Sequence, residues 1–236
     1  MLGKDARVSE MLRMPLSRRP GTTGRLRGGV VVFCDPHSYP RNVDRIVDVP
    51  GFIPAVGIHP KQVSTWTASE MESFKILMRS PKVKALGEVG LDFQARHMEK
   101  QEEVLRYILR AYADPAKPVI LHLRGPRGNE GVAYSRGMKL AKKCLDKTQP
   151  VQLHCFNGGS AAFARWREYF PNVYASFPLT KDQKRGLKGV PAEQSLIEID
   201  APYLPTVDKN PFRRLLPWQI KISAASLGFL APKAKL

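Results

Sequence analysis

"KALGEVGLDF", residues 84–93, places Glu88 between Gly87 and Gly90 in an otherwise apolar run, with a second acid, Asp92, four positions later. Such a run predicts a buried β-strand. Burying a carboxylate without a partner costs several kcal/mol, so we expect Glu88 to hold a metal ion or, as the alternative, to be one half of a structural ion pair.

Short apolar runs of the same kind alternate along the chain with stretches of helical period. Seven runs predict strands, and they lie at residues 30–35, 52–59, 84–89, 118–123, 151–156, 172–177 and 195–200. Four stretches predict amphipathic helices, at residues 69–80, 100–113, 134–146 and 160–170. This alternation predicts an α/β fold of βα units around a parallel sheet. Strands that are apolar without strict alternation are covered on both faces, which suits a barrel or a doubly wound sheet.

The composition and apolar periodicity of the chain indicate one domain preceded by a basic arm. Residues 1–29 contain six arginines among Gly, Ser, Thr and Pro and show little apolar periodicity, so we expect a flexible N-terminal arm. An Arg-rich, acid-poor leader also has some likeness to an organellar transit peptide. Nothing divides residues 30–236, which we expect to form a single domain.

The charge balance favours a polyanionic partner. Lys and Arg total 38 against 21 acids, giving a net charge of +17, which favours nucleic acid or an anionic membrane face over a merely solvated basic surface. The three cysteines form no C-x-x-C pair, which predicts a reducing compartment and no cysteine-rich zinc site. Because no apolar run approaches membrane-spanning length, we expect an intracellular protein, cytoplasmic or nuclear.

Five of the predicted strands carry an acid or a histidine at or near their ends. These residues are His59, Glu88, His122, His154 and Asp200. In a βα barrel the C-terminal ends of all strands open on one face, so we expect the five side chains to converge. Imidazoles and carboxylates together make a site suited to Zn, Mn or Mg.

Each of these residues also has an ordinary structural interpretation. A single histidine at the end of a strand is more often a hydrogen-bonded structural residue than a ligand, and Asp200 could be a helix N-cap. The repetition over five strands favours a functional site. By contrast, His37 and His97 lie in polar loops and are expected to be exposed, and Cys155 is expected to be a buried apolar residue.

The stretch "FARWREYF", residues 163–170, interleaves aromatic and basic side chains. Phe163, Trp166 and Phe170 are spaced three and four apart, which predicts the buried face of a helix with the arginines outside. A base-stacking surface for single-stranded nucleic acid is the alternative.

Five motifs in this order resemble those of the TatD-type metal-dependent deoxyribonucleases: "VGIHP", "GEVGLDF", "KPVILHLR", "HCFNG" and "IEIDAPYL". The resemblance runs from about residue 30 to residue 220. It implies a TIM-barrel fold of the amidohydrolase-like superfamily, a divalent metal (Mg, Mn or Zn) at its mouth, and hydrolysis of DNA phosphodiester bonds.

The resemblance also implies a role for each strand-end residue. Glu88 is similar to the family's bridging metal ligand, and His122 and His154 are similar to its imidazole ligands. Asp200 matches the acid that binds metal and the attacking water, and His59 lies where the family has a histidine beside the substrate phosphate.

Arg124, two residues after His122, is placed to contact a phosphate with its planar guanidinium, and a solvated loop cation is the alternative.

The chain departs from the family pattern at both ends. No Asp-x-His-x-His motif precedes residues 30–35, and the sequence after residue 221 is short, so we expect the first βα unit and part of the C-terminal helical region to be missing. The barrel is then incomplete, with seven recognisable strands, and Glu88, His122 and His154 hold one firm metal site at most. Alternatives to a nuclease are a catalytically impaired member that binds nucleic acid without cleaving it, and a hydrolase of small nucleotides or amides.

Overall fold

The computed structural model describes residues 29–39, 51–178 and 189–198. Within these ranges seven strands form one parallel sheet in the order β1-β2-β3-β4-β5-β6-β7. The strands are β1 (Gly29–Phe33), β2 (Phe52–Val56), β3 (Ala85–Asp92), β4 (Val119–Arg124), β5 (Val151–His154), β6 (Val173–Pro178) and β7 (Ser195–Glu198). The helices are α3 (Ala68–Arg79), α4 (Met98–Tyr112), α5 (Gly131–Cys144) and α6 (Gly159–Tyr169), with short 3-10 helices η2 (Pro36–Ser38), η3 (Pro60–Gln62) and η5 (Ala192–Gln194).

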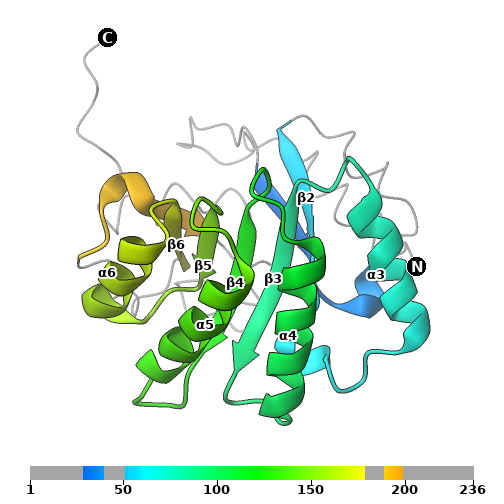
Figure 1. Cartoon of the computed structure of the whole chain (residues 1–236), viewed down its shortest axis with the longest axis horizontal. Helices are drawn as coiled ribbons and strands as arrows, with labels where there is room; N and C mark the ends of the chain where they lie inside the picture. Colours follow the sequence, from blue (N-terminus) through cyan, green and yellow to red (C-terminus); the bar gives the residue numbers. More distant parts are fainter. Residues whose placement is uncertain (1–28, 40–50, 179–188, 199–236) are drawn as a thin grey trace, which may run out of the picture.

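All seven predicted strands and all four predicted helices are present, and the prediction of βα units around a parallel sheet is confirmed. The helices α3 to α6 lie side by side over one face of the sheet (Figure 1). Because the spatial order of the strands follows the chain without reversal, the sheet winds in one direction, as in a barrel. A doubly wound sheet would reverse its strand order part-way.

Local sequence signals mark both ends of α3, whereas the N-caps of α4, α5 and α6 make no side-chain hydrogen bond. The helix α3 begins at a capping box, in which the Thr67 hydroxyl accepts the Glu70 N–H at 3.2 Å and the Glu70 carboxylate accepts the Thr67 N–H at 2.8 Å. It ends at Arg79, and its C-cap Ser80 precedes Pro81, a residue that has no backbone N–H to continue the helix.

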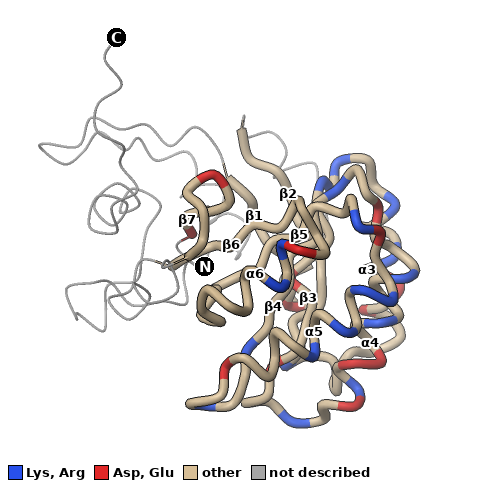
Figure 2. Tube along the Cα trace, turned by 60° about the vertical axis from the view of Figure 1, so that its left-hand side comes forward, with Lys and Arg blue, Asp and Glu red and all other residues tan. Residues whose placement is uncertain are grey.

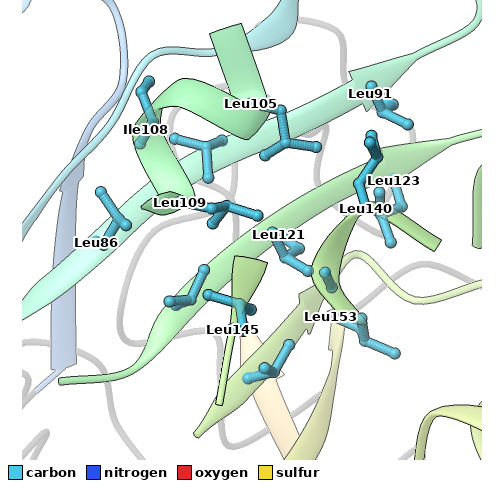
Figure 3. Close-up of a cluster of buried hydrophobic side chains, with 14 of the residues drawn as sticks. Leu86, Leu91, Leu105, Ile108, Leu109, Leu121, Leu123, Leu140, Leu145 and Leu153 are labelled. Atoms are coloured by element: carbon cyan, nitrogen blue, oxygen red, sulfur yellow. The ribbon is translucent and has the colours of Figure 1, made fainter. Parts of the chain in front are cut away.

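The main hydrophobic core lies between these helices and the strands (Figure 3). Along β4, Val119, Leu121 and Leu123 are buried in this core. Strand side chains alternate between the two faces, so Ile120, His122 and Arg124 lie on the opposite face. Figure 3 shows side chains from α4 meeting those of β3 and β4, and the labelled members are Leu86, Leu91, Leu105, Ile108, Leu109, Leu121, Leu123, Leu140, Leu145 and Leu153.

The aromatic stretch after residue 160 belongs to this core. Phe163, Trp166 and Phe170 are each at most 1% exposed, and the Trp166 indole N–H donates to the Tyr134 carbonyl at 3.2 Å. The predicted buried helix face is therefore confirmed, and these rings are not available for stacking on bases.

In the described part of the chain, β1 and β7 form the two edges of the sheet. Both edges present apolar side chains to solvent, since Val30 and Val32 of β1 and Leu196 of β7 are exposed. Basic and acidic residues are interspersed along α3 and α4, whereas the charged residues of α5 are all basic (Figure 2). None of the helices described is both long and apolar enough to cross a membrane. Residues 1–28 lie outside the described ranges, so the division into an arm (1–29) and a domain (30–236) stays a prediction.

Candidate metal centre

Three of the predicted site residues, Glu88, His122 and His154, meet on the adjacent strands β3, β4 and β5. His154 ends β5 and His122 lies two residues before the end of β4. The prediction that Glu88 closes its strand is wrong, because β3 continues beyond it to Asp92. The strand register pairs Gly90 with His122 and His122 with His154. Glu88 Oε1 lies 3.2 Å from His122 Nδ1 and 3.0 Å from His154 Nε2. One ligand atom from each residue lies within 4.8 Å of the other two, and all three side chains are at most 14% exposed. One carboxylate oxygen thus faces one nitrogen of each of two imidazoles.

The glycines beside Glu88 allow β3 to pack closely against β4. The register between these strands shifts between Leu86 and Val89, an irregularity that can re-aim a side chain. A Cβ on Gly87 would lie 2.6 Å from Ile120 Cβ, and one on Gly90 would overlap the His122 carbonyl oxygen. Both glycines have φ values, 145° and 158°, that L side chains rarely adopt. The pattern G-E-x-G is therefore what lets a buried carboxylate stand beside a neighbouring strand's histidine.

Replacing Gly90 with alanine is expected to lower the free energy of unfolding by about 3 kcal/mol, because the new methyl group must displace the backbone of β4 at His122. The matched control is Gly128→Ala. Gly128 also has a positive φ, 78°, but a Cβ there would have no heavy atom within 4 Å, so only the backbone strain of about 1 kcal/mol remains. Urea unfolding of both variants checks the difference, and equal losses would contradict the close approach.

The charges in the cluster support one another. Burial acts to raise the pKa of Glu88, but the charge of His154 and hydrogen bonds to His122 and His154 outweigh it and hold that pKa well below 4.5. Burial acts to lower the pKa of His154, but the carboxylates of Glu198 and Glu88 raise it well above 6.5. The pKa of His122 is also raised, because Asp92 and Glu88 outweigh its burial. Within the cluster, the carboxylates thus favour the charged form of the imidazoles, and the imidazoles favour the charged form of Glu88.

His59 lies beside this cluster in a different protonation state. Its ring centroid is 4.4 Å from that of His122, and its Nδ1 accepts the Lys61 N–H at 3.1 Å as the N-cap of η3. Burial and the neighbouring His122 charge lower the pKa of His59 to about 4. At neutral pH the ring is therefore neutral, with its proton on Nε2.

Two cations extend the rim next to His59. Arg124 Nη1 and Lys61 Nζ lie 3.6 Å and 3.7 Å from Asp92 Oδ2, and their side chains are 42% and 51% exposed. Lys61 also borders a pocket of about 310 Å³. The other residues that line this pocket are Ser64, Gln94, Ala95, Arg96 and His97. Its charged side chains are basic, so the surface beside the cluster suits an anionic ligand.

Two carboxylates that the sequence did not assign to the site also touch it. Asp92 Oδ2 is 3.5 Å from His122 Nε2, and Glu198 Oε2 is 2.6 Å from His154 Nδ1. The signal for Glu198 was its place two residues before Asp200, on the same face of the strand. Asp92 was visible as the second acid of "GEVGLDF". Asp200 itself lies outside the described residues, so its place in the site stays a prediction.

The predictions of exposure and burial for His37, His97 and Cys155 are only partly confirmed. His37 and His97 are exposed, as predicted. The expectation that Cys155 is a buried apolar residue is wrong, because the residue is only half-buried, has φ of 47°, and donates its backbone N–H to Glu198 at 2.8 Å. Cys34, after β1, places its thiol 3.7 Å from Glu88 Oε2.

Comparisons with known proteins identify relatives of this chain. The 3'-5' ssDNA/RNA exonuclease TatD of Musicola paradisiaca is 32% identical over 205 residues, which cover 83% of this chain and 73% of that protein. The protein of the same name from Escherichia coli K12 is 34% identical over 164 residues, covering 66% of this chain and 60% of that protein. The chain thus spans between three fifths and three quarters of the length of these two relatives.

A solved structure shares the fold. The TatD homologue YjjV from Escherichia coli K12 superposes with a TM-score of 0.65 at 20% sequence identity, covering 86% of this chain and 78% of that one. The predicted TIM-barrel-type fold is confirmed by this likeness and by the singly wound parallel sheet. The family model of TatD-related DNases matches residues 21–230. The chain therefore belongs to the family of TatD-related DNases.

Proposed function

We propose that this protein is a divalent-metal-dependent nuclease that hydrolyses phosphodiester bonds of DNA. The observation that carries the proposal is the contact of Glu88 Oε1 with His122 Nδ1 and His154 Nε2 in one buried cluster. The two TatD relatives are named as ssDNA/RNA exonucleases, which supports a nucleic-acid substrate. The net charge of +17 also supports a nucleic-acid substrate.

The donor set fits a divalent ion. One carboxylate and two imidazoles are ligands that Mn and Zn accept, and a carboxylate is the ligand that Mg prefers. The donor atoms already lie within 4.8 Å of one another, and binding a cation there requires each imidazole to be unprotonated at the nitrogen that faces Glu88. We propose Glu88, His122 and His154 as the protein ligands, with Asp200 as a fourth.

A divalent ion bound by these ligands would supply Lewis-acid chemistry and lower the pKa of a water molecule towards neutrality. The chain's own residues then bind and orient the substrate. His59, neutral at pH 7, would donate its Nε2–H to a phosphate oxygen, and Arg124 would bind phosphate oxygens with its guanidinium. Asp200 would orient the attacking water and accept its proton.

Two further parts of the proposal concern the N-terminal residues and the location. The arginines in residues 1–29 would add contacts to the phosphate backbone. The protein would work inside the cell, in the cytoplasm or nucleus, which is supported by a sequence with only three cysteines and no C-x-x-C pair.

The deciding experiment incubates the full chain with labelled single-stranded DNA and Mg, Mn or Zn, and repeats it with a chelator. Double-stranded DNA and single-stranded RNA form separate arms that define the substrate. We expect metal-dependent cleavage of single-stranded DNA that the chelator abolishes. If no metal gives cleavage above the chelator background while DNA binding stays strong and salt-sensitive, the proposal is wrong and the protein is the catalytically impaired member that binds nucleic acid without cleaving it.

Arg124→Ala is expected to weaken single-stranded DNA binding about tenfold at low salt and to make the slope of log affinity against log salt shallower by about one. The reason is the loss of one phosphate contact at the rim. The matched control is Arg165→Ala, on the exposed face of α6, which is expected to leave both quantities unchanged. Fluorescence anisotropy titrations over a salt series measure them, and an unchanged slope in Arg124→Ala would show that this guanidinium is only solvated.

A further inference from the structure

The two imidazoles of the candidate metal centre each have a second carboxylate behind them. His154 Nδ1 lies 2.6 Å from Glu198 Oε2, and His122 Nε2 lies 3.5 Å from Asp92 Oδ2. We propose that Glu198 and Asp92 are positioning residues, each of which takes the ring proton of one imidazole and so turns the other ring nitrogen towards Glu88 and the metal. This inference rests on the metal centre of the proposed function.

Glu198 is held by one donor from the residue that follows β5 and one donor from β6. Its Oε1 accepts the Cys155 N–H at 2.8 Å, and its Oε2 accepts the Ser176 hydroxyl at 2.6 Å. Ser176 is itself fixed, because its oxygen accepts the Gln152 side-chain N–H at 2.9 Å. An ionised carboxylate can only accept hydrogen bonds, so His154 must present a protonated Nδ1 to it. The unprotonated Nε2 of the neutral ring is then the nitrogen that faces Glu88.

Asp92 faces His122 as Glu198 faces His154, but at a longer distance. Its backbone is pinned by the fully buried side chain of Gln101, whose Oε1 accepts the Asp92 N–H at 2.7 Å. Its Oδ1 accepts the Gln94 N–H at 2.9 Å. This leaves Oδ2 to face His122 Nε2, Lys61 and Arg124.

The contact between Asp92 and His122 is an ion-pair distance, longer than an ordinary hydrogen bond. Asp92 Oδ2 and His122 Nε2 are both buried, and neither makes a hydrogen bond to another group in the described ranges. A buried donor and a buried acceptor that face each other have each other as their natural partner. Asp92 therefore orients the His122 ring with Nδ1 towards Glu88.

The two rings thus use different nitrogens for the same purpose. His122 offers Nδ1 and His154 offers Nε2, and in each ring the opposite nitrogen meets a carboxylate. In proteins, metal-binding histidines generally donate their second ring N–H to an acceptor, which fixes the tautomer and raises the basicity of the ligand. Here the two pairs join residues of four strands, β3 with β4 and β5 with β7.

The first test measures metal affinity. Glu198→Gln and Asp92→Asn keep the size of each side chain but remove its charge, and each is expected to weaken Mn binding by about 10–100-fold in calorimetric titrations. Glu168→Gln, on the exposed face of α6, is the matched control and is expected to bind Mn like wild type. Melting temperatures of the metal-free variants show whether each one is folded.

The second test measures the tautomers of His122 and His154 directly in the zinc-loaded wild-type protein. It therefore tests the positioning role even if a variant does not fold. Long-range ¹H–¹⁵N NMR spectra of the histidine rings are expected to show the proton of His154 on Nδ1 and that of His122 on Nε2. Glu198→Gln should shift the ring signals of His154 alone, and Asp92→Asn those of His122 alone. A merely structural role would not give this selectivity.

Three results overturn the inference in distinguishable ways. Protons on the opposite nitrogens in the zinc-loaded wild type would contradict the positioning role directly. Folded Glu198→Gln and Asp92→Asn variants that bind Mn as tightly as wild type would leave the metal centre intact and refute only the two positioning residues. A folded wild-type protein that binds no divalent ion would refute the proposed metal centre, and this inference with it.

Discussion

Replacing Glu88 with alanine is expected to abolish tight divalent-metal binding and to lower metal-dependent DNA cleavage by on the order of 1,000-fold. Glu88 supplies the one oxygen that contacts both imidazoles of the cluster. Without it, two neutral rings remain as described donors, and a hard cation such as Mg binds poorly to nitrogen alone. The measurements are Mn titration by calorimetry and the initial rate of single-stranded DNA cleavage.

The matched control for this variant is again Glu168→Gln, which removes an exposed acid from α6 and is expected to change neither quantity. Glu88→Gln is a second useful variant, because it keeps the shape of the side chain and so separates loss of charge from loss of packing. If folded Glu88→Ala bound Mn within about threefold of wild type (a difference of less than 1 kcal/mol), the carboxylate would not be a ligand.

The second large effect concerns pH. As the pH rises, the stability of the metal-free protein should fall, whereas its affinity for a divalent metal should rise. The pKa values of His122 and His154 are raised in the folded state, because nearby carboxylates outweigh their burial. Their contribution to stability is fully present below the unfolded value of 6.5 and is lost as the pH rises through the folded pKa. The metal-free protein should therefore become less stable as the pH rises above 6.5.

The stability of the metal-free protein at low pH depends on the carboxylate of Glu88. The pKa of Glu88 is held well below 4.5, because the imidazoles outweigh its burial. Its contribution is present above 4.5 and is lost as the pH falls through the folded pKa. The metal-free cluster is therefore most stabilising between pH 4.5 and 6.5.

Metal binding should show the reverse dependence, because an ion must displace protons from both imidazoles. Affinity is expected to rise with pH by up to about tenfold per unit for each proton displaced. Thermal melts from pH 5.5 to 9, with and without saturating Mn, test both statements. Melting curves that shift equally with pH in the presence and absence of Mn would contradict the assignment of His122 and His154 as ligands.

The fold could be predicted from the sequence because the βα units repeat a local pattern. Every strand and helix follows from the alternation of apolar runs with helical periods, and the capping residues Thr67 and Glu70 mark the start of α3. The meeting of His122 and His154 could also be predicted, because the ends of parallel strands share one rim and both residues lie near a strand end. Glu88 joins them from the middle of β3, which is longer than the sequence pattern predicted.

The carboxylates behind the imidazoles could not be predicted in the same way. The sequence offers Glu198 and Asp200 two residues apart, and strand alternation places both on one face. Only the register of β7 against β6, which puts Ser176 beside Leu196, brings Glu198 to the Ser176 hydroxyl and to His154. Which nitrogen each ring presents is likewise a property of three-dimensional contacts, because local sequence does not fix the rotation of a histidine ring.

The most direct test of the central claim is a crystal structure of the wild-type protein soaked in Mn, with diffraction data that record the anomalous signal of manganese. The predicted result is a peak within bonding distance of Glu88, His122 Nδ1 and His154 Nε2. The absence of a peak among these three side chains at saturating Mn, or a peak confined to another part of the protein, would contradict the account.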